Sequence, residues 1–265
     1  MASSQKRKQP SEEPPIRERK RSKDLPPNLS ELMNKLVKHA ASFISLFEDN
    51  KPKMTQIVRE FEKFTAELKK MQNTMDDIRR PRTVERSVFA GPLGMFGLTG
   101  VAIGAETAVR TAVAYSANIG KVIKQTGVAN KVEEQGKEFM EIVEPLKENL
   151  EEIKTTCEKM EQRSTELQAG LTLSDVEEFR WLITRVPELK EMSRETLSVT
   201  VEVINIMKKM LLFVVKIVRD CLTLEEDKEL RDTIYKSADQ CQKVVDKFDK
   251  MKNELRNFTG SKEKK

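Results

Sequence analysis

Hydrophobic residues recur at helical spacing along most of the chain. The stretch 57–78 alternates steps of four and three residues between apolar positions, a pattern typical of a coiled-coil seam, and the stretch 230–258 carries a second apolar seam. The first consists of Ile57, Phe61, Phe64, Leu68, Met71, Met75 and Ile78. The second consists of Leu230, Ile234, Cys241, Val244, Val245, Phe248, Met251, Leu255 and Phe258. No continuous alternation of the kind expected for strands occurs, so the sequence predicts an all-α, elongated bundle of long amphipathic helices.

Local signals place the ends of these helices. A capping-box start at Asn28–Glu31 opens a helix that ends near residues 49–50, and Pro52 opens a second helix, because proline is favoured at the first helical position. A helix is also expected over 121–169, where Pro145 should kink or divide it. A further cap lies at 172–177, where Glu177 follows Ser174 by three residues, and the helix after it is most apolar over 189–222. Thr223 restarts the chain in a last helix, which Gly260 closes.

One block departs from this pattern. Residues 87–105 carry no charge in a chain with 34% charged residues, and they hold five of its ten glycines. These are Gly91, Gly94, Gly97, Gly100 and Gly104. Five helical glycines cost about 5 kcal/mol relative to alanine, so an isolated helix here should not persist in water. Close packing against another helix, which the glycine-lined face permits, or a lipid environment would stabilise it.

We expect a helical hairpin over about 87–120. Glu106 and Arg110 are spaced for a helical ion pair, and each would cost about 2.5–3.5 kcal/mol at a bilayer centre, so they mark its polar boundary. Two states stay open: a hairpin buried in a soluble bundle, and a hairpin that meets lipid conditionally. The residues expected to contact lipid are Val88, Phe89, Leu93, Met95, Phe96, Leu98, Val101, Ile103, Val109, Val113 and Ile119.

The net charge of +5 is concentrated at the N-terminus. Residues 1–27 are polar and proline-rich, which predicts a disordered tail, and 261–265 form a second polar tail. The basic residues of the first tail are Lys6, Arg7, Lys8, Arg17, Arg19, Lys20, Arg21 and Lys23. They resemble a bipartite nuclear-import signal, would equally attract anionic lipid, or form a solvated tail with no receptor.

Enzyme chemistry is not expected. The chain has one histidine, His39, and its three cysteines, Cys157, Cys221 and Cys241, fit no metal motif. We interpret all three as core thiols on apolar stripes in a reducing compartment. No cofactor and no specific nucleic acid is predicted. No secretory signal is seen, so we expect a cytoplasmic protein with peripheral or conditional membrane association. The protein would be nuclear if the basic tail directs import.

The central block and the helix after it resemble the apolipoprotein L family. The resemblance rests on GPLGMFGLTGVAIGAETAVRTAVAYSANIGKVIKQ and on FMEIVEPLKENLEEI, and is clearest over 54–160. It implies lipid or membrane association, with a link to lipid transport or membrane permeabilisation. Family hairpins are usually longer and uncharged, so Glu106 and Arg110 favour docking over channel formation.

Two hypotheses follow. In the first, a soluble helical protein inserts in or docks on membranes through 88–119, assisted by the basic residues Arg79, Arg80, Arg82 and Arg86. In the second, the protein is a nuclear or cytosolic coiled-coil adaptor that binds partner helices, or itself, through its heptad seams.

Overall fold

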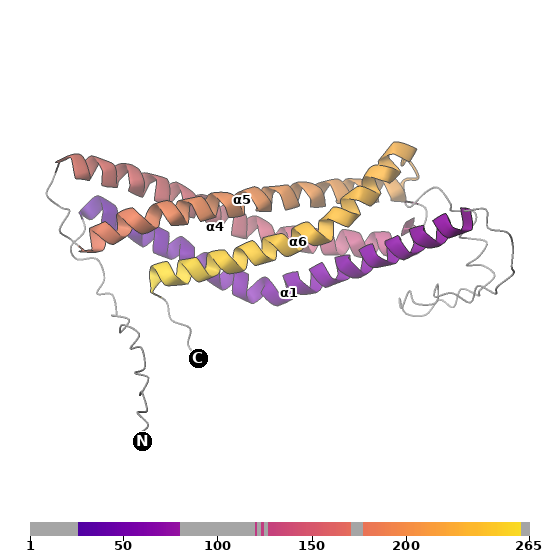
Figure 1. Ribbon diagram of the computed structural model, residues 1–265, viewed down its shortest axis with the longest axis horizontal. Helices are drawn as coiled ribbons and strands as arrows, with labels where there is room; N and C mark the ends of the chain where they lie inside the picture. The colour runs from indigo at the N-terminus through magenta and orange to yellow at the C-terminus, as the bar shows by residue number, and fades with distance from the viewer. Residues whose placement is uncertain (1–25, 80–119, 121–122, 125–126, 171–176, 261–265) are drawn as a thin grey trace, which may run out of the picture.

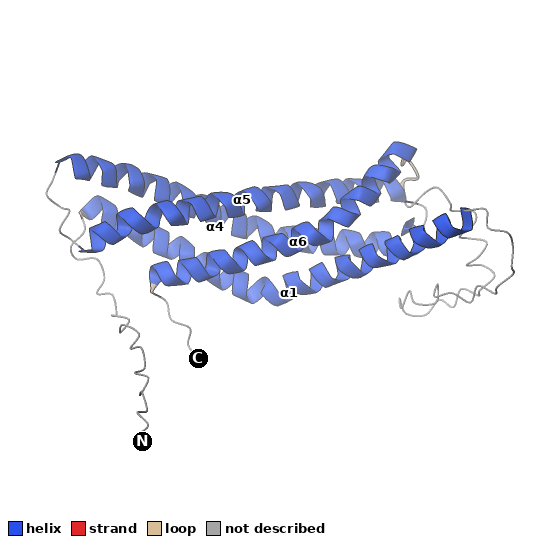
Figure 2. Ribbon diagram, in the orientation of Figure 1, coloured by secondary structure: helices blue, strands red, loops and turns tan. Residues whose placement is uncertain are grey.

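The computed structural model describes residues 26–79, 120, 123–124, 127–170 and 177–260. Four long helices account for nearly all of them: α1 (Pro27–Arg79), α4 (Val128–Gly170), α5 (Glu177–Val218) and α6 (Leu224–Thr259). No strand occurs in these ranges (Figure 2). The prediction of an all-α, elongated helical bundle is therefore confirmed.

The four helices form an antiparallel bundle (Figure 1). Each packs on two neighbours, in the cyclic order α1, α4, α5, α6 and back to α1. Helices α1 and α5 run in one direction and α4 and α6 in the other, so consecutive helices are antiparallel. One end of the molecule, which we call the α5–α6 end, therefore gathers the end of α1, the start of α4, the end of α5 and the start of α6.

A heptad core explains why these sequences pack in this way. Buried positions in α5 alternate steps of three and four residues over almost its whole length: Phe179, Leu182, Val186, Leu189, Ser193, Thr196, Thr200, Val203, Met207, Met210, Val214 and Ile217. A repeat of 3.5 residues keeps one stripe of a helix facing its partners, as in coiled coils and most four-helix bundles. The two predicted seams are buried wherever their side chains are described, from Ile57 to Leu68 and from Leu230 to Phe258.

None of the three prolines divides its helix. Pro52, Pro145 and Pro187 lie inside α1, α4 and α5, so the expected break before residue 52 is wrong, and the helix that follows the predicted cap at 172–177 is α5. An internal proline costs about 3 kcal/mol and tends to kink the helix, and α1 bends near its middle in Figure 1. Heptad residues on both sides of each proline are buried against two neighbouring helices, and this packing keeps each helix continuous.

The predicted cap at Asn28 lies one residue inside α1, which begins at Pro27. The Pro26 carbonyl accepts hydrogen bonds from the backbone amides of Leu29 and Ser30, at 2.9 and 3.0 Å. At the C-terminal end of the last helix, Gly260 adopts φ 69°, the left-handed conformation that glycine tolerates, and closes α6 as predicted.

Aromatic rings and ion pairs join α1 to α6. The ring of Phe248 meets those of Phe43 and Phe47 edge-on, with centroids 5.6 and 5.8 Å apart, and all three side chains are fully buried. Such pairs add about 0.5–1.5 kcal/mol each beyond the area they bury. This cluster fixes the middle of α6 against α1.

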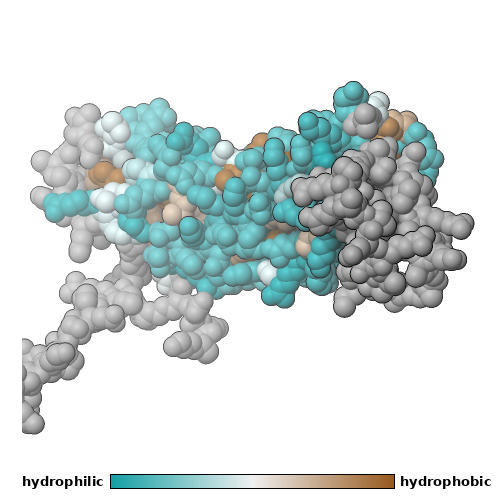
Figure 3. All heavy atoms as spheres, turned by 45° about the vertical axis from the view of Figure 1, so that its right-hand side comes forward, coloured by the Kyte–Doolittle hydropathy of each residue, from teal (hydrophilic) through white to brown (hydrophobic). Residues whose placement is uncertain are grey.

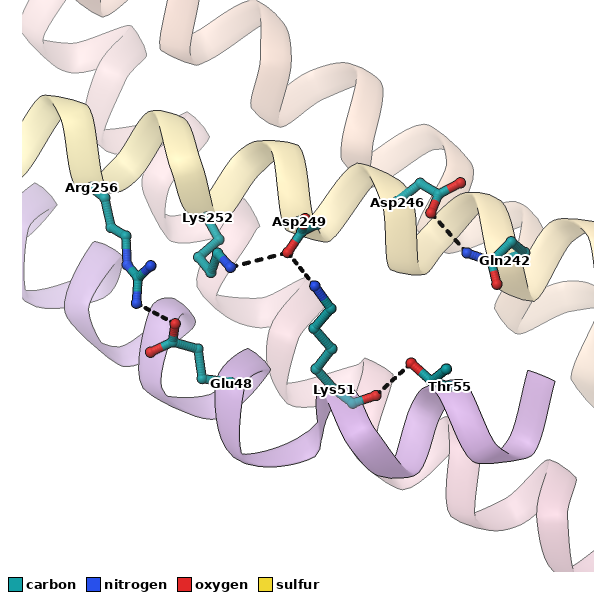
Figure 4. A network of polar contacts seen from close by, with 8 residues as sticks. All are labelled: Glu48, Lys51, Thr55, Gln242, Asp246, Asp249, Lys252 and Arg256. Atoms are coloured by element: carbon teal, nitrogen blue, oxygen red, sulfur yellow. Dashed lines mark hydrogen bonds and ion pairs between the residues drawn. The ribbon is translucent and has the colours of Figure 1, made fainter. Parts of the chain in front are cut away.

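Beside the aromatic cluster lies a chain of charged contacts (Figure 4). The Lys51 ammonium donates to the Asp249 carboxylate at 2.7 Å, Lys252 reaches the same oxygen at 3.0 Å, and Arg256 pairs with Glu48. The hydrogen bond from Lys51 lowers the pKa of Asp249, and the contribution of Lys252 acts in the same direction. These pairs are partly exposed, so they set the register of α6 on α1 more than they add stability.

Candidate functional site at the α5–α6 end

A Schellman motif ends α5. Asp220 adopts φ 55°, an uncommon left-handed conformation that aspartate accepts more readily than most residues. The Cys221 amide donates to the Lys216 carbonyl at 3.1 Å, and the Asp220 amide donates to the Ile217 carbonyl at 3.2 Å. These are the two hydrogen bonds that define the motif, and they stop α5 at Val218, four residues before the predicted end.

A complete capping box begins α6. The Thr223 hydroxyl accepts from the Glu226 amide at 3.2 Å, and the Glu226 carboxylate accepts from the Thr223 amide at 3.0 Å. The second oxygen of Glu226 pairs with Lys216 across the turn. Lys216, and then the Thr223 amide, lower the pKa of Glu226. The predicted restart at Thr223 is confirmed, and the turn between α5 and α6 is tied on both sides.

The chain that returns from α1 is fastened to this turn. The Gly120 amide donates to the buried carboxylate of Asp227, in the first turn of α6, at 2.7 Å. The Lys124 ammonium donates to the Val218 carbonyl at 3.3 Å and pairs with Asp220. A cation here also satisfies a carbonyl at the negative end of the α5 dipole. The start of the α4 region is thus held at the last turn of α5 and the first turn of α6.

Apolar side chains are exposed beside these ties. Leu212, Val215 and Val218 retain 55%, 39% and 53% of their accessible surface, and the fourth large hydrophobic residue exposed in the described ranges is Val201, at 41%. Figure 3 shows hydrophobic surface at the upper right of a molecule whose described surface is otherwise mainly hydrophilic. We call Leu212, Val215 and Val218 the terminal α5 face.

This face continues the contact between α5 and α4. Leu211, one row inward, packs close to Gly136 of α4, where an added Cβ would lie 3.3 Å from the Leu211 side chain. Val215 and Val218 follow Leu211 at spacings of four and three residues, on the same side of the helix. Their exposure means that an apolar row that α4 covers at Leu211 runs on uncovered toward the α5–α6 end.

The residues predicted from the sequence to contact lipid lie outside the described residues. This holds for 88–119, with its glycines and the Glu106–Arg110 pair, and for the basic tail within 1–25. The described residues on either side of 88–119 lie at the same end of the bundle: α1 ends at Arg79, and Gly120 is bound to Asp227, both at the α5–α6 end. The ties at Asp227 and Lys124 were not predicted, because no local signal links residue 120 to a residue more than a hundred positions away.

The thiols divide into two kinds. Cys157 and Cys241 are buried as predicted, and burial raises the pKa of both, that of Cys157 to about 12. Cys221 is exposed, so its assignment to an apolar stripe was wrong. The early end of α5 puts this residue in the turn rather than on a helix.

Two hollows lie elsewhere on the bundle. One of about 200 Å³ lies between α5 and α6, where Arg185 already pairs with Glu188 and Glu254. A wider one of about 690 Å³ lies between α4 and α5, and its two basic side chains, Arg194 and Lys154, pair with carboxylates of their own helices. In both hollows the charged side chains of the lining are already paired within the protein.

The described residues form neither a metal site nor a membrane span. Within the ranges the structure describes, no three histidine, cysteine or acidic side chains come together as a metal site. Among the same residues, no helix combines the length and the apolar character needed to cross a bilayer. His39 lies 3.9 Å from the Glu152 carboxylate at the boundary between α1 and α4.

Comparison with known proteins gives no relative. No family model, no curated protein and no solved structure matches this chain. The resemblance to the apolipoprotein L family therefore stays a prediction.

Proposed function

We propose that this protein binds lipid membranes through the segment 88–119, using the four-helix bundle as a scaffold. The observation that carries the proposal is the place where this segment is attached. The stretch between Arg79 and Gly120, which contains the charge-free, glycine-spaced run 87–105, is attached to the bundle at one end, the same end at which α5 exposes apolar side chains. Such a segment is suited to lipid, where its backbone must hydrogen-bond internally.

The packing of the bundle is consistent with a scaffold that is separate from the lipid-binding segment. Its described core is built by α1, α4, α5 and α6, with the heptad positions of each facing the others. The scaffold can therefore stay folded while the segment changes its surroundings. Glu106 and Arg110 would lie at the membrane boundary rather than at its centre, which favours docking or shallow insertion.

The same packing weakens support for the adaptor hypothesis. The described parts of both heptad seams are buried in the protein's own core, from Ile57 to Leu68 and from Leu230 to Phe258. A partner helix would reach them only if the bundle opened. Membrane binding, which leaves the core intact, is the simpler use of this fold.

Flotation of the full-length protein with neutral and anionic liposomes, at neutral and mildly acidic pH and at low and high salt, tests the proposal. We expect binding that survives high salt, because apolar insertion is not screened by ions. A variant with residues 88–119 replaced by a Gly/Ser linker of equal length should lose it, while the bundle still unfolds cooperatively in urea. A matched variant lacking residues 1–25 should lose only salt-sensitive binding.

Salt-resistant binding by the folded linker variant would contradict the proposal. Binding that is lost in salt and depends on residues 1–25 would assign membrane contact to the basic tail. No binding under any condition would favour the adaptor.

A further inference from the structure

We infer that the terminal α5 face, Leu212, Val215 and Val218, is an intramolecular docking surface whose occupant in water is this chain's own segment 88–119. The inference deepens the proposed function and rests on it for its biological meaning, since it says where the lipid-binding segment lies when no membrane is present.

The face is a localised feature. Three of the four large hydrophobic side chains exposed in the described residues fall within about two turns of α5. Scattered exposed apolar residues are ordinary on a protein surface, whereas a cluster marks a contact site. Along the same side of α5, Leu211 is already covered by α4 at Gly136, so the face extends an existing helix–helix contact.

The attachment of the chain brings the proposed occupant to this face. Gly120 is held by Asp227 at 2.7 Å, and Lys124 reaches the carbonyl of Val218 itself at 3.3 Å. Ile119 is therefore adjacent in sequence to Gly120, which is held beside the face. Val113 is seven residues from Gly120, a length that spans about 10 Å as a helix, so it too can reach α5.

The charges around the face are balanced, so they give an anionic membrane no electrostatic advantage over an uncharged occupant. Asp220 pairs with Lys124, Glu229 with Lys209 and Glu226 with Lys216. The segment 88–119 contains only two charged residues, Glu106 and Arg110, of opposite sign. Its small residues also permit the close approach that an apolar row on a helix requires.

A photo-crosslinking experiment on the full-length protein tests the contact without lipid. The variant Val215→p-benzoylphenylalanine places the probe in the face, and Val201→p-benzoylphenylalanine is the matched control, on the same helix, similarly exposed and about 21 Å away at 1.5 Å per residue. After irradiation of monomeric protein in buffer, mass spectrometry should find crosslinks from position 215 to peptides within 88–119, in several-fold excess over those from position 201. Crosslinks to a second copy, crosslinks confined to the bundle helices, or equal yields from the two positions would overturn the inference.

A second measurement uses liposome flotation of the triple variant Leu212→Ser, Val215→Ser, Val218→Ser. Removing a competing dock raises the binding-competent fraction, so apparent lipid affinity should rise several-fold. A fall would mean that the face itself contacts lipid, and no change would mean that it does not hold the segment; either result overturns the inference. The two proposals fail separately: crosslinking without liposome binding refutes only the membrane function, and liposome binding without crosslinking refutes only the dock.

Discussion

The hydrogen bond between Gly120 and Asp227 predicts how a substitution at the α5–α6 end changes the stability of the protein. Asp227 is 6% exposed, and its carboxylate accepts the Gly120 amide at 2.7 Å from the first turn of α6. Asp227→Ala removes this acceptor and leaves a buried amide without its partner. It also removes a negative charge from the positive end of the α6 dipole.

The expected cost follows from these two losses. A hydrogen bond to a charged group contributes about 1.5–3 kcal/mol and an acidic group in the first turn about 0.3–1 kcal/mol, so Asp227→Ala should destabilise the protein by about 2–4 kcal/mol. At about 2–4 °C per kcal/mol for a protein of this size, the melting temperature should fall by roughly 4–16 °C. Asp227→Asn keeps an acceptor oxygen and should cost less.

Urea denaturation followed by far-UV circular dichroism measures the loss, and hydrogen exchange should show reduced protection of the Gly120 amide. Asp239→Ala is the matched control, because Asp239 is an exposed acid in the interior of the same helix. The reasoning would be refuted if Asp227→Ala and Asp239→Ala agreed within about 0.5 kcal/mol, the usual range of a neutral surface substitution.

Two further predictions concern side chains in the bundle. Cys221 should react with a maleimide in the native protein, whereas Cys157 and Cys241 should react only on unfolding, because burial hides both thiols and raises their pKa. Mass spectrometry counts the labels on each molecule, and more than one rapidly added label would contradict the prediction. The pKa of Asp249 is lowered from its ordinary value of 3.8, so its stabilising contribution is present above that value and is lost as the pH falls through the lower folded-state pKa. The urea midpoint of Asp249→Asn should therefore lie below that of the unmodified protein at pH 7 and approach it at about pH 2; an equal gap at both pH values would show that the lysine contacts do not lower this pKa.

Local sequence was sufficient to predict most of the fold. The heptad spacing of residues such as Phe61 and Phe248 identifies long helices and their buried faces, because the period of an apolar stripe is a property of the helix alone. The cap at Thr223 and the stop at Gly260 were predicted for the same reason, since each depends on residues within one turn.

Local sequence failed where a local preference competes with packing between helices. Pro52 favours a helix start on its own, but the neighbouring helices bury heptad residues on both sides of it and keep α1 continuous. Cys221 fits an apolar stripe by its spacing, yet the left-handed Asp220 ends α5 before the stripe reaches it.

The sequence by itself determined that the chain is helical, which faces are apolar, and that residues 87–105 are unlike the rest, because composition and period are properties of neighbouring residues. Only the tertiary structure decided that the four helices close into one antiparallel ring, that Gly120 is fastened to Asp227, and that Leu212, Val215 and Val218 stay uncovered beside that tie. These facts depend on which distant segments meet. Contacts of that kind are selected by the free energy of the whole packed core, which no local stretch of the sequence contains.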